Sequence, residues 1–233
     1  MGTIGRAFVD ALELLFSFDP GLMEVVARTL QVTIGALVIA LVLGVPVGAA
    51  IGLTRSLPGR ALLVPVIYTG MGLPPVVVGL FTYLLLSNQG PLGALGWLFT
   101  PAGMIVAQTI IALPLVVGLT MAAVEGIDPA LPLQMRALGA KRGQVAVTTL
   151  LEARAGVTAA VVAAYGSIIS EVGAVMLVGG NIEGETRVLT TAIVLETRKG
   201  NFALALALGI VLLGLAFLTN LVFHRLQLRQ GGP

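Results

Sequence analysis

Long apolar stretches without a charged residue dominate the chain, and short charged segments separate them. The uncharged stretches cover residues 29–54, 61–124 and 200–223. A helix needs about 20 apolar residues to cross the hydrocarbon core of a bilayer, and these stretches lack the polar-apolar alternation of β-barrel strands. The pattern therefore predicts an all-α, polytopic membrane protein with about five transmembrane helices. These helices are expected at residues 28–54, 61–87, 101–124, 153–178 and 202–225.

The first 24 residues are expected to lie along the membrane surface, with a sixth span as the alternative. Asp10 and Glu13 interrupt the apolar run, and no cationic start or small-residue cleavage site is present, which disfavours a cleaved signal peptide. Asp19-Pro20 is a break at which the next segment can start. Four apolar side chains fall on one helical face of this segment: Phe8, Leu12, Leu15 and Phe16.

The composition supports a membrane protein and excludes several kinds of site. Hydrophobic residues make up 57% of the chain and charged residues 10%, and the mean hydropathy is +1.03. There is no cysteine and only one histidine, His224, so disulfides, thiolate metal sites and multi-histidine metal sites are excluded. The net charge of +2 comes from basic residues in short loops, which membrane topology explains better than nucleic-acid binding. We therefore expect no metal and no nucleic acid as partners, and membrane lipid around the helices.

The basic residues indicate an orientation, because lysine and arginine near the ends of spans favour the cytoplasm. Five spans place the chain ends on opposite sides, so we expect residues 125–152 and the C-terminus in the cytoplasm and the N-terminus outside, in a bacterial or archaeal inner membrane. This orientation places eight basic residues inside: Arg55, Arg60, Arg136, Lys141, Arg142, Arg154, Arg225 and Arg229. Five are outside: Arg6, Arg28, Arg187, Arg198 and Lys199.

Glycines and prolines interrupt the apolar stretches at regular places. Gly44, Gly48 and Gly52 form a stripe of small residues along the first span, which predicts close helix packing within the chain, with a dimer seam as the alternative. The run at residues 71–75 breaks the second span, and Pro114 interrupts the third. Irregular backbone at membrane depth is tolerated only inside protein or beside a cavity. Such breaks are typical of a transporter with a gated path.

Residues 127–156 are the most informative polar segment. Asp128-Pro129 is a helix start, and Gly139 can end the short helix in a left-handed cap. An apolar stripe with a basic rim predicts a docking element for a cytoplasmic partner, and an interfacial helix on lipid headgroups is the alternative. The candidate coupling residues are Leu131, Met135, Arg136, Ala137, Leu138, Gly139, Ala140, Lys141 and Arg142.

The residues 137–140, Ala-Leu-Gly-Ala, match the later half of a signature in the cytoplasmic loop of ABC importer permeases. Leu133, Gln134 and Met135 stand where that signature usually has glutamate and two alanines, so no glutamate role transfers here. Residues 69–80, 87–96 and 169–209 resemble the molybdate, tungstate and sulfate branch of these permeases, with the closest likeness to tungstate importer permeases. The resemblance extends over nearly the whole chain.

This resemblance implies a type I ABC importer permease fold and a division of labour. Residues 1–233 would form one permease domain, and two copies would form the translocation path for an oxyanion. A cytoplasmic ATPase would dock on residues 125–152, and an extracytoplasmic binding protein would deliver the anion outside, where the amphipathic segment 179–201 would re-enter the path. The chain has no G-x-x-x-x-G-K-[ST] phosphate loop. The chain is therefore expected to bind no cofactor and not to be an enzyme. ATP and magnesium are expected on the partner ATPase.

An oxyanion path requires hydrogen-bond donors and little negative charge, and uncharged polar residues supply such donors. The alternative is that these groups link neighbouring helices. Glu171 is the acid within the fourth span, and we expect it to pair with Arg187 or to face another helix. The candidates for the path or gate are Thr69, Gly72, Pro74, Pro75, Gln108, Ser167, Ser170, Glu171, Asn181, Thr190 and Thr191.

Two other functions compete with the importer permease. An autonomous secondary transporter or channel for a small anion would be built from internal repeats, and five spans do not divide into equal halves. A membrane-embedded enzyme would need a second catalytic group beside Glu171, and the sequence offers none. The sequence leaves the choice between tungstate, molybdate and another oxyanion open.

Overall fold

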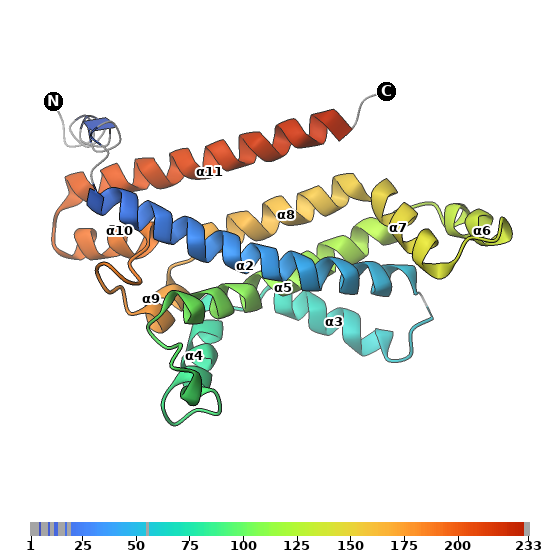
Figure 1. The fold of residues 1–233 in the computed structure, drawn as a ribbon, viewed down its shortest axis with the longest axis horizontal. Helices are drawn as coiled ribbons and strands as arrows, with labels where there is room; N and C mark the ends of the chain where they lie inside the picture. Colours follow the sequence, from blue (N-terminus) through green and yellow to red (C-terminus); the bar gives the residue numbers. More distant parts are fainter. Residues whose placement is uncertain are drawn as a thin grey trace. The chain divides into compact units, whose positions relative to one another are not determined.

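The computed structural model describes Gly5, Val9, Leu12, Glu13, Ser17 and residues 20–54 and 56–230. Most of the predicted surface segment at residues 1–24, together with Arg6 and Arg55, lies outside this description. The described part of the chain is helical and contains no strand (Figure 1). Its elements are α2 (Pro20–Leu53), α3 (Arg60–Met71), α4 (Pro75–Leu86), the 3-10 turn η1 (Gly93–Leu95), α5 (Pro101–Glu125), α6 (Ala130–Ala137), α7 (Arg142–Glu152), α8 (Arg154–Ile169), α9 (Gly173–Gly179), α10 (Leu189–Arg198) and α11 (Phe202–Gln230).

Three of these helices are long and apolar enough to cross a membrane: α2, α5 and the Phe202–Phe223 part of α11. Two helix pairs meet the same criteria only together, because each pair is bent at a short break. α3 and α4 are bent by 99°, and α7 and α8 by 69°. Counting each pair as one span gives up to five spans within the described residues, which agrees with the expected all-α polytopic fold.

The helix bounds differ from three of the predicted spans. α2 begins at Pro20 rather than at residue 28, because proline is favoured in the first turn of a helix. The second predicted span is divided at residues 72–74, so the predicted break at residues 71–75 is confirmed. Pro74 lacks a backbone N–H and disfavours helical backbone at the residue before it. The fourth is also divided, since α8 ends at Ile169 and α9 is a separate short helix.

The described residues group into two compact units, and the first holds Pro74–Gln108, Ile168–Val222 and the residues up to Ala36. One cluster of its core joins the start of α2 to α10 and α11 through Leu22, Leu189 and Leu208. A second cluster consists of Val32, Met104, Val175 and Val188. α4 packs directly on α9. Because residues 179–201 fall within this unit, it contains the predicted outer segment with α10.

The second unit holds Leu37–Leu73, Thr109–Ser167 and the residues from Phe223 onward. Here the glycine stripe of α2 lies against α5, so closely that a Cβ atom at Gly48 would lie 2.5 Å from the carbonyl oxygen of Val117. A Cβ at Gly44 would lie 2.8 Å from Val116, and one at Gly52 2.9 Å from Val124. The prediction that the stripe packs within the chain is confirmed.

Replacing Gly48 by alanine should lower the free energy of unfolding by about 1–3 kcal/mol, because the added methyl group overlaps backbone that cannot move away cheaply. Gly214 is the matched control, since a Cβ there meets nothing within 4 Å. Unfolding of the purified protein in mixed detergent, followed by the fluorescence of the single tryptophan, measures both variants. Equal stability of Gly48→Ala and Gly214→Ala would contradict the close approach.

Candidate functional site

The predicted docking element is a helix-turn-helix formed by α6 and α7 in the second unit. Asp128 starts it, because its carboxylate oxygen Oδ1 accepts a hydrogen bond from the backbone N–H of Ala130 at 2.8 Å. Gly139 ends α6 with a φ of 88°. The N–H of Ala140 then donates to the Met135 carbonyl and that of Gly139 to the Arg136 carbonyl, each at 3.0 Å. These two bonds form a Schellman cap, so local sequence chemistry fixes the turn between α6 and α7.

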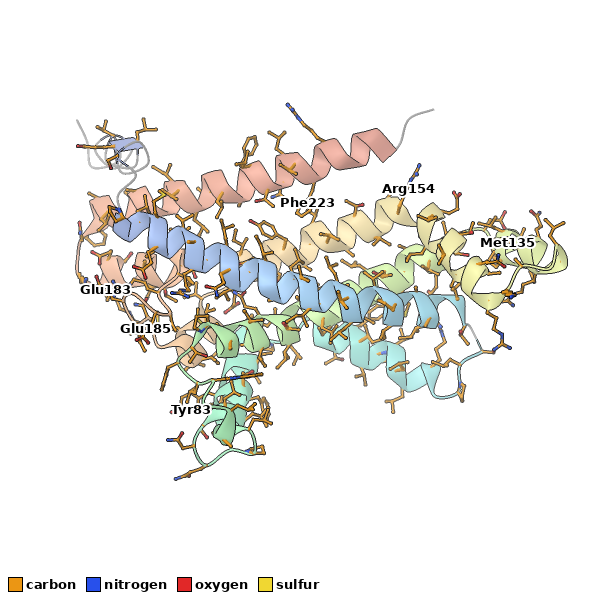
Figure 2. The ribbon with its side chains drawn as sticks, in the orientation of Figure 1. Tyr83, Met135, Arg154, Glu183, Glu185 and Phe223 are labelled. Atoms are coloured by element: carbon orange, nitrogen blue, oxygen red, sulfur yellow. The ribbon has the colours of Figure 1, made fainter. Side chains whose placement is uncertain are left out.

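The turn exposes apolar side chains beside basic ones. Leu138 is 88% exposed, and Leu133, Val147 and Leu151 are exposed as well. Leu131 and Met135 are instead half-buried (Figure 2 labels Met135), so the predicted apolar stripe has an inner part and an outer tip. The remaining coupling candidates are exposed or half-buried around this tip: Arg136, Ala137, Gly139, Ala140, Lys141 and Arg142. Exposed apolar side chains beside basic ones fit either of the two predicted contacts, a cytoplasmic partner or lipid headgroups.

A cavity of about 230 Å³ in the second unit is lined by α6 and by the ends of two longer helices. Gly52 and Leu53 of α2 and Val124 of α5 belong to its lining, as do Leu133 and Arg136 of α6. The docking element and these helix ends therefore border the same cavity.

In the first unit, three of the candidate path residues meet around the break between α8 and α9. The Gln108 amide nitrogen Nε2 donates to the carbonyl oxygen of Ile168 at 3.0 Å. The Thr190 hydroxyl donates to the carbonyl oxygen of Glu171 at 2.9 Å, and all three of these candidate side chains are buried. Gln108 and Thr190 thus bind backbone carbonyl groups at the end of α8 and in the break before α9.

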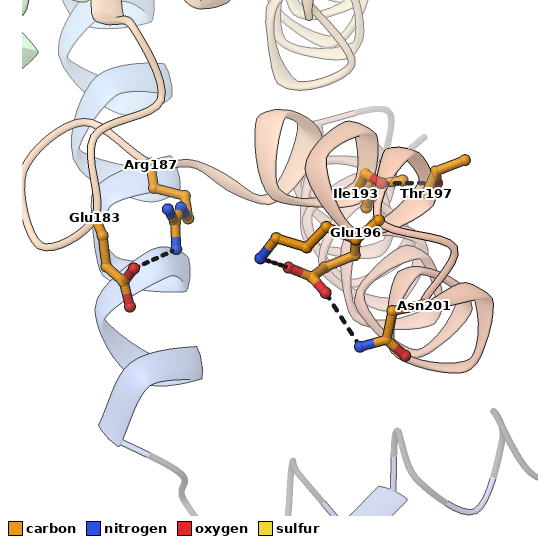
Figure 3. Close-up of polar contacts among 7 residues, drawn as sticks. Glu183, Arg187, Ile193, Glu196, Thr197 and Asn201 are labelled. Atoms are coloured by element: carbon orange, nitrogen blue, oxygen red, sulfur yellow. Dashed lines mark hydrogen bonds and ion pairs between the residues drawn. The ribbon is translucent and has the colours of Figure 1, made fainter.

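The Glu171 side chain caps the start of α9. Its Oε1 atom accepts a hydrogen bond from the backbone N–H of Ala174 at 3.0 Å, and the residue is 9% exposed. The expected pairing with Arg187 is wrong, because Arg187 Nη1 lies 3.1 Å from Glu183 Oε2 (Figure 3). Glu183 is four residues before Arg187, so a local ion pair takes the place of the long-range one. Glu171 is therefore held by backbone at the start of α9.

The other candidates divide between the two units. Thr69, Gly72 and Ser167 belong to the second unit, where the Thr69 hydroxyl donates to the Pro65 carbonyl of its own helix at 2.8 Å. The rest belong to the first unit: Pro74, Pro75, Ser170, Asn181 and Thr191. Thr191 is buried and its hydroxyl bonds both to the N–H and to the carbonyl of Val188. Bonds to nearby backbone therefore account for the hydroxyl groups of Thr69 and Thr191.

Asn181 differs from these residues. It has a φ of 56°, in the left-handed region, and its buried Oδ1 atom has no hydrogen-bond partner among the described residues. The buried Oε1 of Gln108 has none either. An unpaired acceptor would attract a donor and repel an oxyanion, so these two amides can serve an anion only through their N–H groups.

Two threonines that the sequence reasoning missed fix the segment before α10. The Thr29 hydroxyl of α2 accepts from the backbone N–H of Leu189 at 2.9 Å. The Thr186 hydroxyl accepts from the N–H of Ile182 at 3.0 Å and donates to the Gly179 carbonyl. The only sequence signal for this role is a hydroxyl group at an otherwise apolar position. The same signal also fits a hydrogen bond that links neighbouring helices.

A cavity of about 200 Å³ in the first unit lies beside α10 and is lined by several charged residues. Its charged lining residues are Glu24, Arg28, Glu183, Glu185, Arg187 and Glu196. Glu196 accepts hydrogen bonds from Lys199 at 2.8 Å and from Asn201 at 3.1 Å (Figure 3), and the bond from Lys199 lowers the pKa of Glu196 below its ordinary value. No group of three potential metal-ligating residues is close enough for a metal ion in the described part of the chain.

Comparison with known proteins assigns the chain to a family. Residues 44–231 match the binding-protein-dependent transport system inner membrane component. A probable anion ABC transporter permease protein of Haloferax volcanii is 43% identical over 216 residues, covering 91% of this chain and 93% of that protein. The tungstate uptake system permease protein TupB of Peptoclostridium acidaminophilum is 39% identical over 227 residues, covering 97% and 99%.

The fold has a close counterpart among solved structures. The chain matches a chain of the MetNI methionine ABC transporter in an inward-facing conformation with a TM-score of 0.73. The match covers 91% of this chain and 97% of the other at 19% identity, which supports the fold alone. Fold, family match and relatives agree with one another. The chain therefore belongs to the binding-protein-dependent transport system inner membrane component family, as an ABC transporter permease of the molybdate, tungstate and sulfate branch.

Proposed function

We propose that this chain is the permease of an ATP-driven importer for tungstate, with molybdate as a second substrate. The observation that supports this most is the similarity to a tungstate permease along 97% of the chain. In this family ATP is bound by a partner ATPase, so the permease itself performs no chemistry. Residues 1–233 act as one permease domain, and two copies form the path.

The permease works with two further partners. The ATPase docks on residues 125–152, where Leu138 and the surrounding basic residues form the exposed tip. An extracytoplasmic oxyanion-binding protein meets the opposite side, near residues 179–201. The excess of basic residues on the α6–α7 side supports this orientation, with the C-terminus in the cytoplasm and the N-terminus outside.

A single cysteine at Leu138 of this cysteine-free chain should therefore react with an impermeant maleimide in inside-out but not in right-side-out vesicles.

Neutral donors rather than cations guide the anion through the membrane. Residues 61–124 carry no charge, so no fixed cation holds the anion there and release stays fast. The N–H groups of Gln108 and Asn181 and the hydroxyls of Ser167 and Ser170 are the proposed path donors. Two breaks are the proposed gates: the one at Gly72, Pro74 and Pro75, and the one at Glu171. Backbone that has left its helix can change conformation at low cost.

Reconstitution into liposomes tests this function. The permease, its ATPase and its binding protein together should take up radiolabelled tungstate only when ATP is supplied on the ATPase side. Molybdate should compete with tungstate more strongly than sulfate does. Tungstate uptake by the permease alone, driven by an ion gradient, would contradict the proposal and support the secondary transporter or channel. Failure of the chain to purify with an ATPase would contradict it as well.

A further inference from the structure

The guanidinium group of Arg60 joins three helices at one end of the second unit. Arg60 is the first residue of α3, and its Nη1 donates to the carbonyl oxygen of Ile51 at 2.7 Å and to that of Thr54 at 3.3 Å, at the end of α2. Its Nη2 forms an ion pair with Oε1 of Glu125, the last residue of α5. We call this set of contacts the Arg60 clamp.

The chemistry of the clamp is specific to arginine. A planar guanidinium presents several N–H donors in a fixed fork, so it can bind two carbonyl groups and a carboxylate together, which the single ammonium of lysine does less well. The Arg60 and Glu125 side chains are 21% and 31% exposed. Their attraction is therefore less screened than that of a fully exposed pair. Capping α2 alone would not require Glu125, which is 65 residues further along the chain.

The clamp lies next to the docking element. Glu125 precedes the start of α6 at Ala130 by a short turn, and it lines the same cavity as Leu133 and Arg136 of α6. Gly52 and Leu53, beside the clamped carbonyl of Ile51, line that cavity too. A displacement of α6 would therefore press on helix ends that Arg60 holds together.

We infer that Arg60 and Glu125 are positioning residues that transmit movement of the docking element to α2, α3 and α5, so that ATP hydrolysis drives uptake. This inference rests on the proposed function, because it requires an ATPase on α6 and α7. Without the clamp the three helix ends would move separately, and the displacement that the ATPase causes would remain confined to the region around α6. Hydrolysis would then continue while uptake falls.

The test measures tungstate taken up per ATP hydrolysed in proteoliposomes that contain the permease, ATPase and binding protein. Arg60→Ala and Glu125→Ala should each lower this ratio about fivefold or more. The double variant should lose no more than Arg60→Ala alone, because the only contact that Glu125 makes in the clamp is with Arg60. Arg60→Lys should lie between wild type and Arg60→Ala. Arg225→Ala is the matched control, as Arg225 is an exposed arginine of α11 in the same unit and outside the docking element, and its ratio should equal that of the wild type.

A second readout needs no transported anion. A cysteine at Leu73, an exposed residue two positions after the end of α3, should react with a maleimide at a rate that ATP changes in the wild-type complex and no longer changes in Arg60→Ala. Absence of tungstate uptake by the wild type would contradict the proposed substrate, whereas the labelling rates would still decide on the clamp. An unchanged ratio and an unchanged ATP response in Arg60→Ala, or losses that multiply in the double variant, would overturn the inference. If the alanine variants fail to assemble, Arg60→Lys and Glu125→Gln decide by the same two measurements.

Discussion

A Leu138→Glu substitution should prevent stable binding of the ATPase and reduce ATP-driven uptake at least tenfold. Leu138 is 88% exposed at the tip of the turn between α6 and α7, so the substitution costs the folded permease little. Burying a leucine side chain in an interface contributes about 1.5–3 kcal/mol. A loss of 1.4 kcal/mol corresponds to about a tenfold weaker complex, and a buried carboxylate adds a desolvation cost.

The controls for this prediction separate docking from folding. Leu138→Met keeps the volume and the apolar character of the side chain, and it should retain the ATPase through purification. Thermal unfolding of the isolated Leu138→Glu permease should match that of the wild type, because the altered side chain touches little of its own chain. A Leu138→Glu permease that still purifies with its ATPase and takes up tungstate at the normal rate would show that the partner binds elsewhere.

The sequence predicted the short helix α6 and the turn after it well because their chemistry is local, while the docking role stays a prediction. Asp128 binds an N–H group two residues away, and Gly139 adopts the left-handed conformation that glycine allows without strain. The glycine stripe of α2 was predicted for a similar reason, since only small residues permit such close helix packing. The existence and type of these elements follow from neighbours in the sequence.

The break in the second span was predicted from the run at residues 71–75, although hydropathy alone gives no sign of the 99° bend there. The break in the fourth span was not predicted. The break before α9 depends on Gln108, which binds Ile168 from 60 residues away, and on Thr190, 19 residues beyond Glu171. Such long-range partners leave no periodic pattern in the sequence.

The wrong partner for Glu171 illustrates the same point. Two charged residues in one region suggested an ion pair, yet Arg187 had Glu183 at the favourable spacing of four residues. A local partner requires less ordering of the chain than a distant one, so it is the safer prediction when both are available. Glu171 instead caps a helix whose start was not predicted.

Glu171→Leu should lower the free energy of unfolding by about 1–3 kcal/mol and abolish most ATP-driven uptake. The substitution removes the acceptor of the Ala174 N–H group, and a buried donor without a partner costs about this much. Glu171→Gln should retain most of both properties, because its amide oxygen can still accept that bond. Unfolding in mixed detergent and tungstate uptake by the reconstituted complex measure the two effects.

The contrast between these variants distinguishes a structural role of Glu171 from a role of its charge. If the negative charge itself operates the gate, Glu171→Gln would lose uptake while unfolding stays normal, and the capping explanation would be wrong. Glu185→Leu is the control for stability, since Glu185 is an exposed acid on the loop before α10 (Figure 2). The unfolding free energy of this variant should stay within about 0.5 kcal/mol of that of the wild type. Because a capping acid needs only an acceptor oxygen, the glutamine variant is the decisive one.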